Sequence, residues 1–322
     1  MKNCYVLRCE IWRQEIRDTF VVGSEKIRSL RDIVKEAATY LKTSEIENPR
    51  LDAERLMGDV LGLSRAELYL SFDRLLKASE RERYKNLVRR RAAHQPLQYI
   101  LGETEFMALS FKVTPDVLIP RPETEILVEK IIETVKNQAG IRILDIGTGS
   151  GNIAVSLARY LKSADVVAVD SSPKALSVAR ENARMHRVEG KVRFLQSDIR
   201  EPHFAQAMDS PFDLVVSNPP YISAEAWDDL PIEIRQYEPK SALCDGEDGL
   251  VFFRIIAQKG RQLLRSDGRL FFEVGDGQHE EVKNILRKLK YQDVVVYPDL
   301  NGIERVVVGV WTGNARGIRS RE

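Results

Sequence analysis

From residue 139 onward, continuous apolar runs alternate with segments in which apolar residues return every three or four positions. Runs such as "ADVVAVD" predict strands buried on both faces, and segments such as "SPKALSVARENARMH" predict amphipathic helices. This alternation is typical of an α/β fold, in which helices cover both faces of a doubly wound sheet. Few residues separate the last two runs, "DVVVYP" and "RVVVGVW". Because a parallel crossover needs a longer connection, we expect an antiparallel pair there.

The sequence before residue 139 has a different character. Apolar residues at helical spacing predict a small helical domain, in which Ser64 and Glu67 resemble a capping box. The short runs "FKVT" and "DVLI" predict a β-hairpin linker, and Pro122 suits the first position of the helix that follows. We therefore divide the chain into an N-terminal extension (1–26), a helical domain (27–97), a hairpin linker (98–122), an α/β domain (123–313) and a basic tail (314–322).

Charge and cysteine content narrow the classes of partner. The 49 Lys and Arg residues balance the 48 Asp and Glu residues, so no net charge attracts the chain to nucleic acid or to an anionic membrane. The 3 cysteines and 4 histidines are scattered, which fits a reducing compartment and predicts no metal site. The sequence has no signal-peptide pattern and no apolar stretch of about 18 residues. We expect a cytoplasmic monomer that binds neither a membrane nor stable nucleic acid.

The segment "ILDIGTGSGNIA" predicts a glycine-rich turn between the first strand of the sheet and the next helix. Ligands of such folds bind beyond the carboxyl ends of the strands, where glycine lets the backbone come close. A dinucleotide fingerprint would have Gly or Ala where this chain has Asn152. The G-x-G-x-G form with an acid before it instead resembles motif I of S-adenosylmethionine-dependent methyltransferases. The cofactor-binding residues predicted here are Asp145, Gly147, Thr148, Gly149, Ser150 and Gly151.

Two further acids follow strands at the same predicted edge of the sheet. Asp170 stands about twenty residues after the glycine turn, where a carboxylate can accept hydrogen bonds from both ribose hydroxyls. The alternative is a helix cap before "SPKA". Asp198 and Ile199 follow the third strand, where class I methyltransferases often contact the adenine. The alternative there is a solvated turn with a capping aspartate.

The fourth strand ends in "LVVSNPPY", which places an amide, two prolines and a ring at this edge. A planar amide or aromatic amine is a poor nucleophile, so a site that alkylates one must hold its NH2 group. The side-chain carbonyl of Asn218 and the backbone carbonyl of Pro219 can accept those hydrogens, and proline keeps the array stiff. We expect Tyr221 to cover the planar group. No metal is required, and the alternative is an ordinary strand-end turn. The predicted catalytic residues are Asn218, Pro219, Pro220 and Tyr221.

The tetrapeptide alone leaves N6 of adenine, N4 of cytosine and N5 of glutamine open as targets. The surrounding segments "ENPRLDAERLMGDVLGLSRAELYL", "RRAAHQPLQYILGETEF", "VTPDVLIPRPETEILVE", "YEPKSALCDGEDGL" and "DLNGIERVVVGV" closely resemble the HemK/PrmC family, from about Ile27 to Trp311. Members of this family are glutamine N5-methyltransferases of peptide-chain release factors.

The resemblance implies a Rossmann-like, seven-stranded class I methyltransferase domain, with S-adenosylmethionine as the methyl donor and S-adenosylhomocysteine as the product. It implies that a class 1 release factor is the substrate, with the glutamine of its Gly-Gly-Gln loop beside "NPPY" and its surface docked on the helical domain. The cofactor would lie at the glycine turn, Asp170 and Asn218. Arg121 and Glu123 of "IPRPETE" would lie beside the substrate, and the alternative for them is a helix start with solvated charges.

Some residues depart from the family pattern, and two other functions stay open. Residues 1–26 have no counterpart, Ile199 stands where many members carry an aromatic residue, and Cys244 is interpreted as a packing change. The first alternative function is an adenine-N6 methyltransferase acting on RNA or DNA, for which the "RRR" at residues 89–91 is the best basic patch. The second is a helical adaptor whose methyltransferase-like domain only binds.

Overall fold

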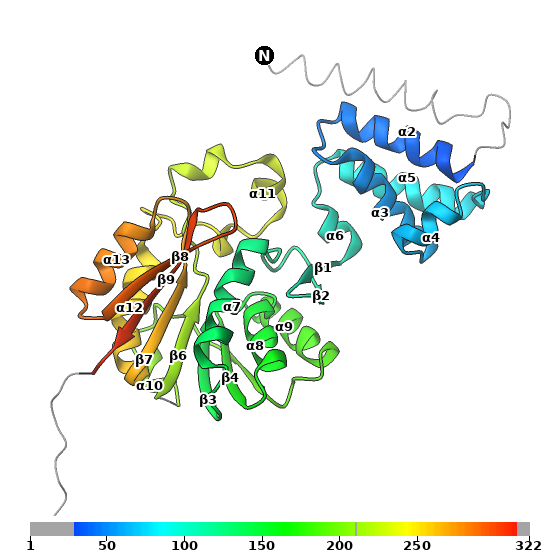
Figure 1. The fold of residues 1–322 in the computed structure, drawn as a ribbon. Helices are drawn as coiled ribbons and strands as arrows, with labels where there is room; N and C mark the ends of the chain where they lie inside the picture. Colours follow the sequence, from blue (N-terminus) through cyan, green and yellow to red (C-terminus); the bar gives the residue numbers. More distant parts are fainter. Residues whose placement is uncertain (1–28, 210, 314–322) are drawn as a thin grey trace, which may run out of the picture. The chain divides into compact units, whose positions relative to one another are not determined.

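The computed structural model describes residues 29–209 and 211–313, so the predicted extension at 1–26 and the tail at 314–322 lie outside the described residues. The chain separates into two compact units between Ala93 and His94. The first is drawn in blue to cyan and the second in cyan to red (Figure 1). Across the described ranges, no helix is long and apolar enough to cross a membrane.

The first unit is built from α-helices. They are α2 (Leu30–Thr43), α3 (Pro49–Leu61), α4 (Arg65–Leu70) and α5 (Ala78–Ala92). The predicted capping box is confirmed at the start of α4, where the Ser64 and Glu67 side chains each accept a hydrogen bond from the other's backbone N–H. Ion pairs to the buried carboxylates of α3 tie the helices together. Arg91 donates to Asp52 at 2.6 Å, and Glu54 accepts from Arg65 at 2.8 Å.

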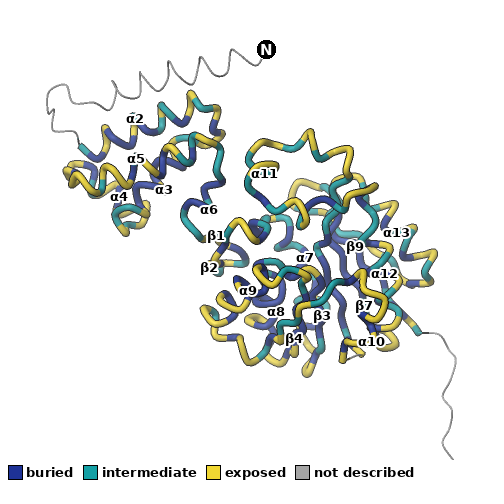
Figure 2. The backbone as a smooth tube through the Cα atoms, turned by 180° about the vertical axis from the view of Figure 1, so that it is seen from behind, coloured by how far each residue is buried: buried dark blue, intermediate teal, exposed yellow. Residues whose placement is uncertain are grey.

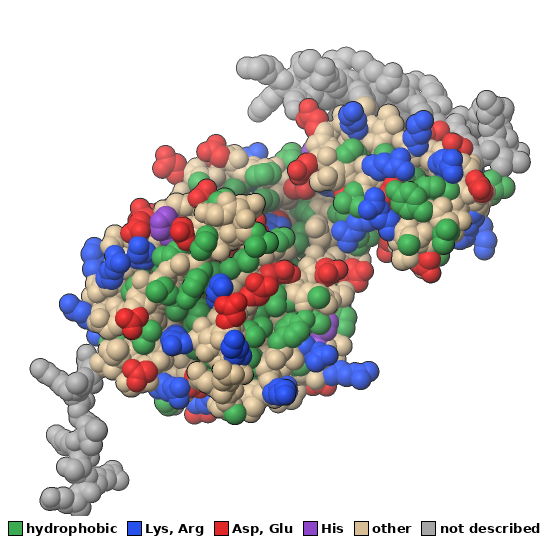
Figure 3. Space-filling view, viewed as in Figure 1, with side chains coloured by type: hydrophobic (Ala, Val, Ile, Leu, Met, Phe, Trp, Pro, Cys, Tyr) green, Lys and Arg blue, Asp and Glu red, His purple; other side chains and the backbone are tan. Residues whose placement is uncertain are grey.

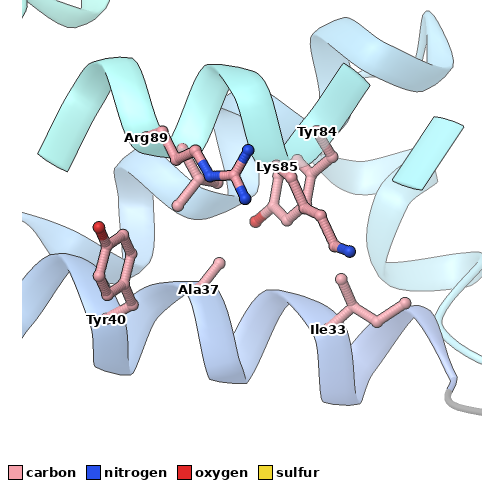
Figure 4. Close-up of a pocket in the computed structure, with 7 residues that line it drawn as sticks. Ile33, Ala37, Tyr40, Tyr84, Lys85 and Arg89 are labelled. Atoms are coloured by element: carbon pink, nitrogen blue, oxygen red, sulfur yellow. The ribbon is translucent and has the colours of Figure 1, made fainter. Parts of the chain in front are cut away.

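A small recess lies between α2 and α5, lined by Tyr40, Tyr84 and Arg89 among others (Figure 4). Its volume of ≈ 20 Å³ has room for a single water molecule or little more. The buried Tyr84 hydroxyl donates to the Ala53 carbonyl at 3.0 Å, so its polar atom is already satisfied. The recess is therefore a packing feature and not a ligand site.

The second unit contains a seven-stranded sheet with the order β5-β4-β3-β6-β7-β9-β8. Its strands are β3 (Ile141–Ile146), β4 (Ala164–Asp170), β5 (Val192–Gln196), β6 (Phe212–Ser217), β7 (Leu264–Glu273), β8 (Gln292–Pro298) and β9 (Glu304–Trp311). The first five are parallel, and β9 runs antiparallel to both β7 and β8. The predicted antiparallel final pair is confirmed.

Helices cover both faces of this sheet, and its central strands are mostly dark blue in Figure 2. Side chains of α7 (Pro122–Val135), α8 (Asn152–Tyr160) and α9 (Pro173–Met185) pack on one face, and those of α10 (Phe204–Ala207), α12 (Val251–Leu263) and α13 (His279–Lys288) pack on the other. Along β4, Val166 and Ala168 belong to the first core, and Val167 and Val169 belong to the second. The α/β prediction is confirmed, because a strand covered on both sides must be apolar at every position.

The remaining elements connect the strands or lead into the sheet. The α-helices are α6 (Leu97–Leu101), α7 (Pro122–Val135), α8 (Asn152–Tyr160), α9 (Pro173–Met185), α10 (Phe204–Ala207), α11 (Ile232–Tyr237), α12 (Val251–Leu263) and α13 (His279–Lys288). Two short 3-10 helices are η1 (Ala226–Asp229) and η2 (Lys240–Ala242).

The predicted hairpin pairs different residues from those expected. Strand β1 (Glu103–Phe106) pairs with β2 (Leu109–Lys112), whereas "DVLI" forms no strand. Val117 instead donates to the Thr114 carbonyl in a turn, and Ile119 donates to a side chain. The tight turn at Met107 and Ala108 has φ near +50° at both positions, without the Asn-Gly signal that normally marks it.

Candidate active site

A cavity of ≈ 420 Å³ opens at the carboxyl ends of β3, β4 and β6. This size falls within the range of small-molecule sites, and the position is the one at which doubly wound sheets bind ligands. It brings together residues that are far apart in the sequence. The predicted site residues along its wall are Gly147, Gly149, Asp170, Asp198, Ile199, Asn218, Pro219 and Pro220.

The glycine turn is held against β4 by backbone hydrogen bonds. The N–H groups of Gly147 and Thr148 both donate to the Val169 carbonyl, at 2.9 and 3.0 Å. Gly151 has φ +80°, and a Cβ there would lie 3.0 Å from the Ala179 Cβ of α9. Glycine is therefore required at this position for backbone conformation and for close packing of α8 on α9.

Asp145 lies beneath this turn and is fully buried. One carboxylate oxygen accepts a hydrogen bond of 2.6 Å from the Thr148 hydroxyl, and the other has no partner among the described residues. Burial raises the pKa of Asp145 to about 7, and the hydrogen bond from Thr148 only partly opposes this. Four of the predicted cofactor-binding residues do not line the cavity and instead lie in or beneath the glycine turn: Asp145, Thr148, Ser150 and Gly151.

Asp170 faces the cavity from the end of β4. One of its oxygens accepts from the Gly149 N–H at 2.9 Å, and the other accepts from the Ser172 N–H at 2.8 Å. Each carboxylate oxygen has a further lone pair that a ribose hydroxyl can use. Burial raises the pKa of Asp170, and its bonds to backbone N–H groups partly offset this. The carboxylate thus links the glycine turn to the start of α9.

Asp198 and Ile199 form another part of the wall. The Arg200 guanidinium donates to both oxygens of the Asp198 carboxylate, from Nε to Oδ1 at 3.0 Å and from Nη2 to Oδ2 at 2.6 Å. This pairing lowers the pKa of Asp198, so the group is an anion at neutral pH. Ile199 is buried and belongs to the core beneath α12 while still lining the cavity.

Asn218 follows β6 directly and lies in the cavity wall. Its side-chain nitrogen donates to the Thr124 hydroxyl of α7 at 3.2 Å. The Ser217 hydroxyl just before it donates to the Ile146 carbonyl at 2.7 Å and fixes the end of β6 against β3. Because the amide nitrogen of Asn218 is engaged behind the wall, its carbonyl oxygen is the atom left for a ligand.

The Tyr221 backbone is held tightly. Its carbonyl accepts from the Gln278 amide at 2.9 Å, and a Cβ at Gly249 would lie 2.5 Å from that carbonyl oxygen. The ring is half-buried beside Gly275, and burial raises the pKa of the Tyr221 hydroxyl. Its predicted position over the target group stays a prediction.

Arg121 and Glu123 stand at the start of α7. Arg121 donates a hydrogen bond to Glu238, whose carboxylate is buried and also accepts from the Ile119 N–H at 3.4 Å. This contact anchors the segment before α7 to the loop that follows α11. The predicted substrate contacts of Arg121 and Glu123 stay predictions.

Residues 32–102 match the family model described as the PrmC N-terminal domain, and residues 137–297 match one described as a methyltransferase domain. A release factor glutamine methyltransferase of Geobacter sulfurreducens is 42% identical over 284 residues, which covers 88% of this chain and 97% of that protein. Another, from Chlorobaculum tepidum, is 42% identical over 287 residues, with coverages of 87% and 97%. The chain belongs to the release factor glutamine methyltransferase family. The predicted HemK/PrmC resemblance is confirmed.

A solved structure agrees at the level of the fold. The hMettl16 catalytic domain, crystallised with a MAT2A 3'UTR hairpin, matches with a TM-score of 0.53 and 17% identity, covering 72% of this chain and 84% of that one. As a release factor glutamine methyltransferase family member, the protein is an S-adenosylmethionine-dependent enzyme. The cavity fits this cofactor in size, in its glycine-lined wall and in the carboxylate of Asp170.

In this methyltransferase, several residues at the site were not predicted from the sequence. Four such residues come from distant parts of the chain, and each lies against one of the predicted residues: Thr124, Glu238, Glu273 and Gln278. Glu273 could have been found as an acid at a strand end. The others carried no signal, because their importance depends on long-range packing.

Replacing Asp145 with asparagine is expected to flatten the pH dependence of stability. The pKa of Asp145 is about 7 in the folded state and ordinarily 3.8, so the folded state binds its proton more tightly. The free energy of unfolding therefore falls as pH rises from about 4 to about 7, by about 1.4 kcal/mol for each pKa unit. We expect the free energy of unfolding of the variant, relative to that of wild type, to rise by about 2 kcal/mol or more between pH 5 and pH 8. Urea unfolding of the cofactor-free proteins measures this difference. An equal difference at both pH values would contradict this.

Proposed function

We propose that the protein transfers a methyl group from S-adenosylmethionine to the side-chain amide nitrogen N5 of the glutamine in the Gly-Gly-Gln motif of class 1 release factors. The names of relatives that match nearly their whole length support this substrate. The observation that carries the chemistry is Asn218, whose carbonyl is left for the cavity because its nitrogen is bonded to Thr124. We propose that this carbonyl and the Pro219 carbonyl hold the glutamine NH2.

The chain's own groups act here by binding and orientation. The amide lone pair is delocalised into its carbonyl, so a site that holds both hydrogens off the amide plane favours attack by nitrogen. S-adenosylmethionine supplies the electrophilic methyl group when it is bound. Asp170 would hold the ribose of the cofactor, and the glycine turn would let the backbone come close to it. Asp198 and Ile199 would contact the adenine. After transfer the methylated amide nitrogen is strongly acidic and loses its proton to solvent. The site therefore needs no dedicated base.

We assign substrate docking to the helical domain, residues 27–97, and the cofactor chemistry to residues 123–313. The first unit exposes Tyr69, Leu70 and Leu75 at and after α4, which gives it apolar surface suited to a protein partner. We also propose that the enzyme works as a monomer in the cytoplasm, where release factors act.

An adenine-N6 methyltransferase acting on nucleic acid is not favoured. Of the basic run at residues 89–91, Arg91 is buried in an ion pair with Asp52 at 2.6 Å. Acidic and basic side chains are mixed on the face of the second unit in Figure 3, which is a poor footprint for phosphates. The likeness to hMettl16 concerns the fold alone.

Incubation with labelled S-adenosylmethionine and a panel of release factors tests this function. We expect one methyl group on the tryptic peptide that contains Gly-Gly-Gln, and none when that glutamine is replaced by alanine. Label on another residue, or methylated adenine in added RNA at a rate with steep salt dependence, would overturn the assignment.

A further inference from the structure

A buried polar cluster lies behind Asn218. Ser217 at the end of β6 is in register with Phe272 of β7, so the next residues, Asn218 and Glu273, lie side by side. Thr124, from the first turn of α7, completes the cluster. Thr124 is 1% exposed and Glu273 is 2% exposed, and both stand outside the described cavity lining.

The polar groups of this cluster favour one direction of hydrogen bonding. The Asn218 side-chain nitrogen donates to the Thr124 oxygen at 3.2 Å. The Glu273 carboxylate lies beside both side chains, and one of its buried oxygens has no hydrogen-bond partner among the described residues. An ionised carboxylate only accepts, so Glu273 attracts the single hydroxyl hydrogen of Thr124, and a lone pair of the Thr124 oxygen accepts from Asn218. A flipped Asn218 amide would bring its oxygen against two acceptors. The cluster therefore distinguishes the two ends of an amide that are nearly identical in shape.

We propose that Thr124 and Glu273 are positioning residues that hold the carbonyl oxygen of Asn218 toward the substrate amide. This inference rests on the proposed function. A reversed Asn218 would present its NH2 to the NH2 of the substrate and could not accept its hydrogens. The two residues would thus control the rate of transfer without touching either substrate.

The electrostatic surroundings of Glu273 make this control sensitive to pH. Burial raises the pKa of Glu273 to about 7, and nearby Glu123 of α7 adds to the rise. The polar side chains of Thr124 and Asn218 beside it and the charge of Arg305 of β9 oppose this rise. Glu273 in turn raises the pKa of the nearby Tyr221 hydroxyl. Once protonated, Glu273 can donate, so the cluster no longer has one direction. We expect the transfer rate to fall as pH drops through about 7.

The first test replaces Thr124 with valine, which keeps the shape and removes the hydroxyl. We expect kcat to fall about 10- to 100-fold, with KM for the release factor and Kd for S-adenosylmethionine within about threefold of wild type. Thr124→Ser should restore most of the rate. Thr134→Val is the matched control, because Thr134 lies in the same helix and its hydroxyl bonds only to the Lys130 carbonyl at 2.8 Å. Its kcat should equal that of wild type.

The second test replaces Glu273 with glutamine, which is similar in shape and can donate as well as accept. We expect a fall in kcat of about 10-fold at pH 8 and loss of the pH limb near 7 that wild type shows. This variant also serves if Thr124→Val does not fold, which thermal unfolding would reveal.

The outcomes separate this inference from the proposed function. Wild-type protein that fails to methylate any release factor would refute the proposed function. If wild-type protein is active, two results would overturn the positioning role alone. One is a Thr124→Val variant with the kcat of wild type, and the other is a Glu273→Gln variant that keeps both the rate and the pH limb. Equal losses in Thr124→Val and Thr134→Val would show a general effect on α7 and would also overturn it.

Discussion

Replacing Asn218 with alanine is expected to lower the single-turnover rate of methyl transfer by at least about 100-fold, because it removes one of two acceptors that hold the substrate amide. Affinity for S-adenosylmethionine should change little, since the glycine turn and Asp170 are untouched. The measurement is single-turnover transfer to a release factor at saturating cofactor, with Kd for the cofactor taken from calorimetry.

Asn301→Ala is a suitable control for this variant. Asn301 is exposed in the turn between β8 and β9, and there its backbone N–H, not its side chain, bonds to Asp299 at 2.8 Å. It should transfer methyl groups at the wild-type rate. Full activity of Asn218→Ala would remove the central claim of the proposed mechanism. A parallel collapse of cofactor binding would mean that Asn218 serves the cofactor and not the amide.

The parts of the site that could be predicted from the sequence are those in which position along the chain and position in space coincide. Gly147 and Asn218 each follow a strand and Asp170 ends one, and the carboxyl ends of parallel strands meet at one edge of a sheet. The strand pattern alone therefore placed them together, and all three line the cavity.

The parts that could not be predicted depend on register and on distant packing. The pairing of Asn218 with Glu273 depends on the alignment of β6 with β7, whose register shifts between Phe212 and Leu214. No local pattern reveals such a shift. The contact of Arg121 with Glu238 likewise joins residues more than a hundred positions apart, from segments that both look like solvated loops.

The prediction that "DVLI" forms a strand of the hairpin was wrong for a related reason, although a hairpin does form within residues 98–122. The run "DVLI" has the composition of a strand, but Pro115 and Pro120 flank it and Thr114 accepts its turn hydrogen bond. Buried Val117 and Ile119 instead pack near Ala175 of α9, next to the cavity. A short apolar run is ambiguous when tertiary contacts supply its burial. Pro115 and Val117 of this segment form part of the cavity wall.

Asp170→Ala is expected to weaken binding of S-adenosylmethionine by about 100-fold. Two charge-assisted hydrogen bonds to ribose hydroxyls would be lost, each contributing about 1.5 kcal/mol or more. The Gly149 N–H would also lose its acceptor at 2.9 Å, so the glycine turn would be held less firmly. Calorimetric titration with S-adenosylmethionine and, separately, with S-adenosylhomocysteine measures the effect without any release factor.

Stability should respond much less than affinity to this change. Burial raises the pKa of Asp170, so its ionised form is held at a cost that alanine removes. That gain offsets the lost bonds to Gly149 and Ser172, and we expect Tm of the cofactor-free variant within about 4 °C of wild type. Asp165→Ala, on the same strand with a side chain 61% exposed, should leave both Kd and Tm unchanged. Wild-type affinity in Asp170→Ala would assign the carboxylate to capping of α9, because a cap contributes to the fold whether or not the cavity is filled.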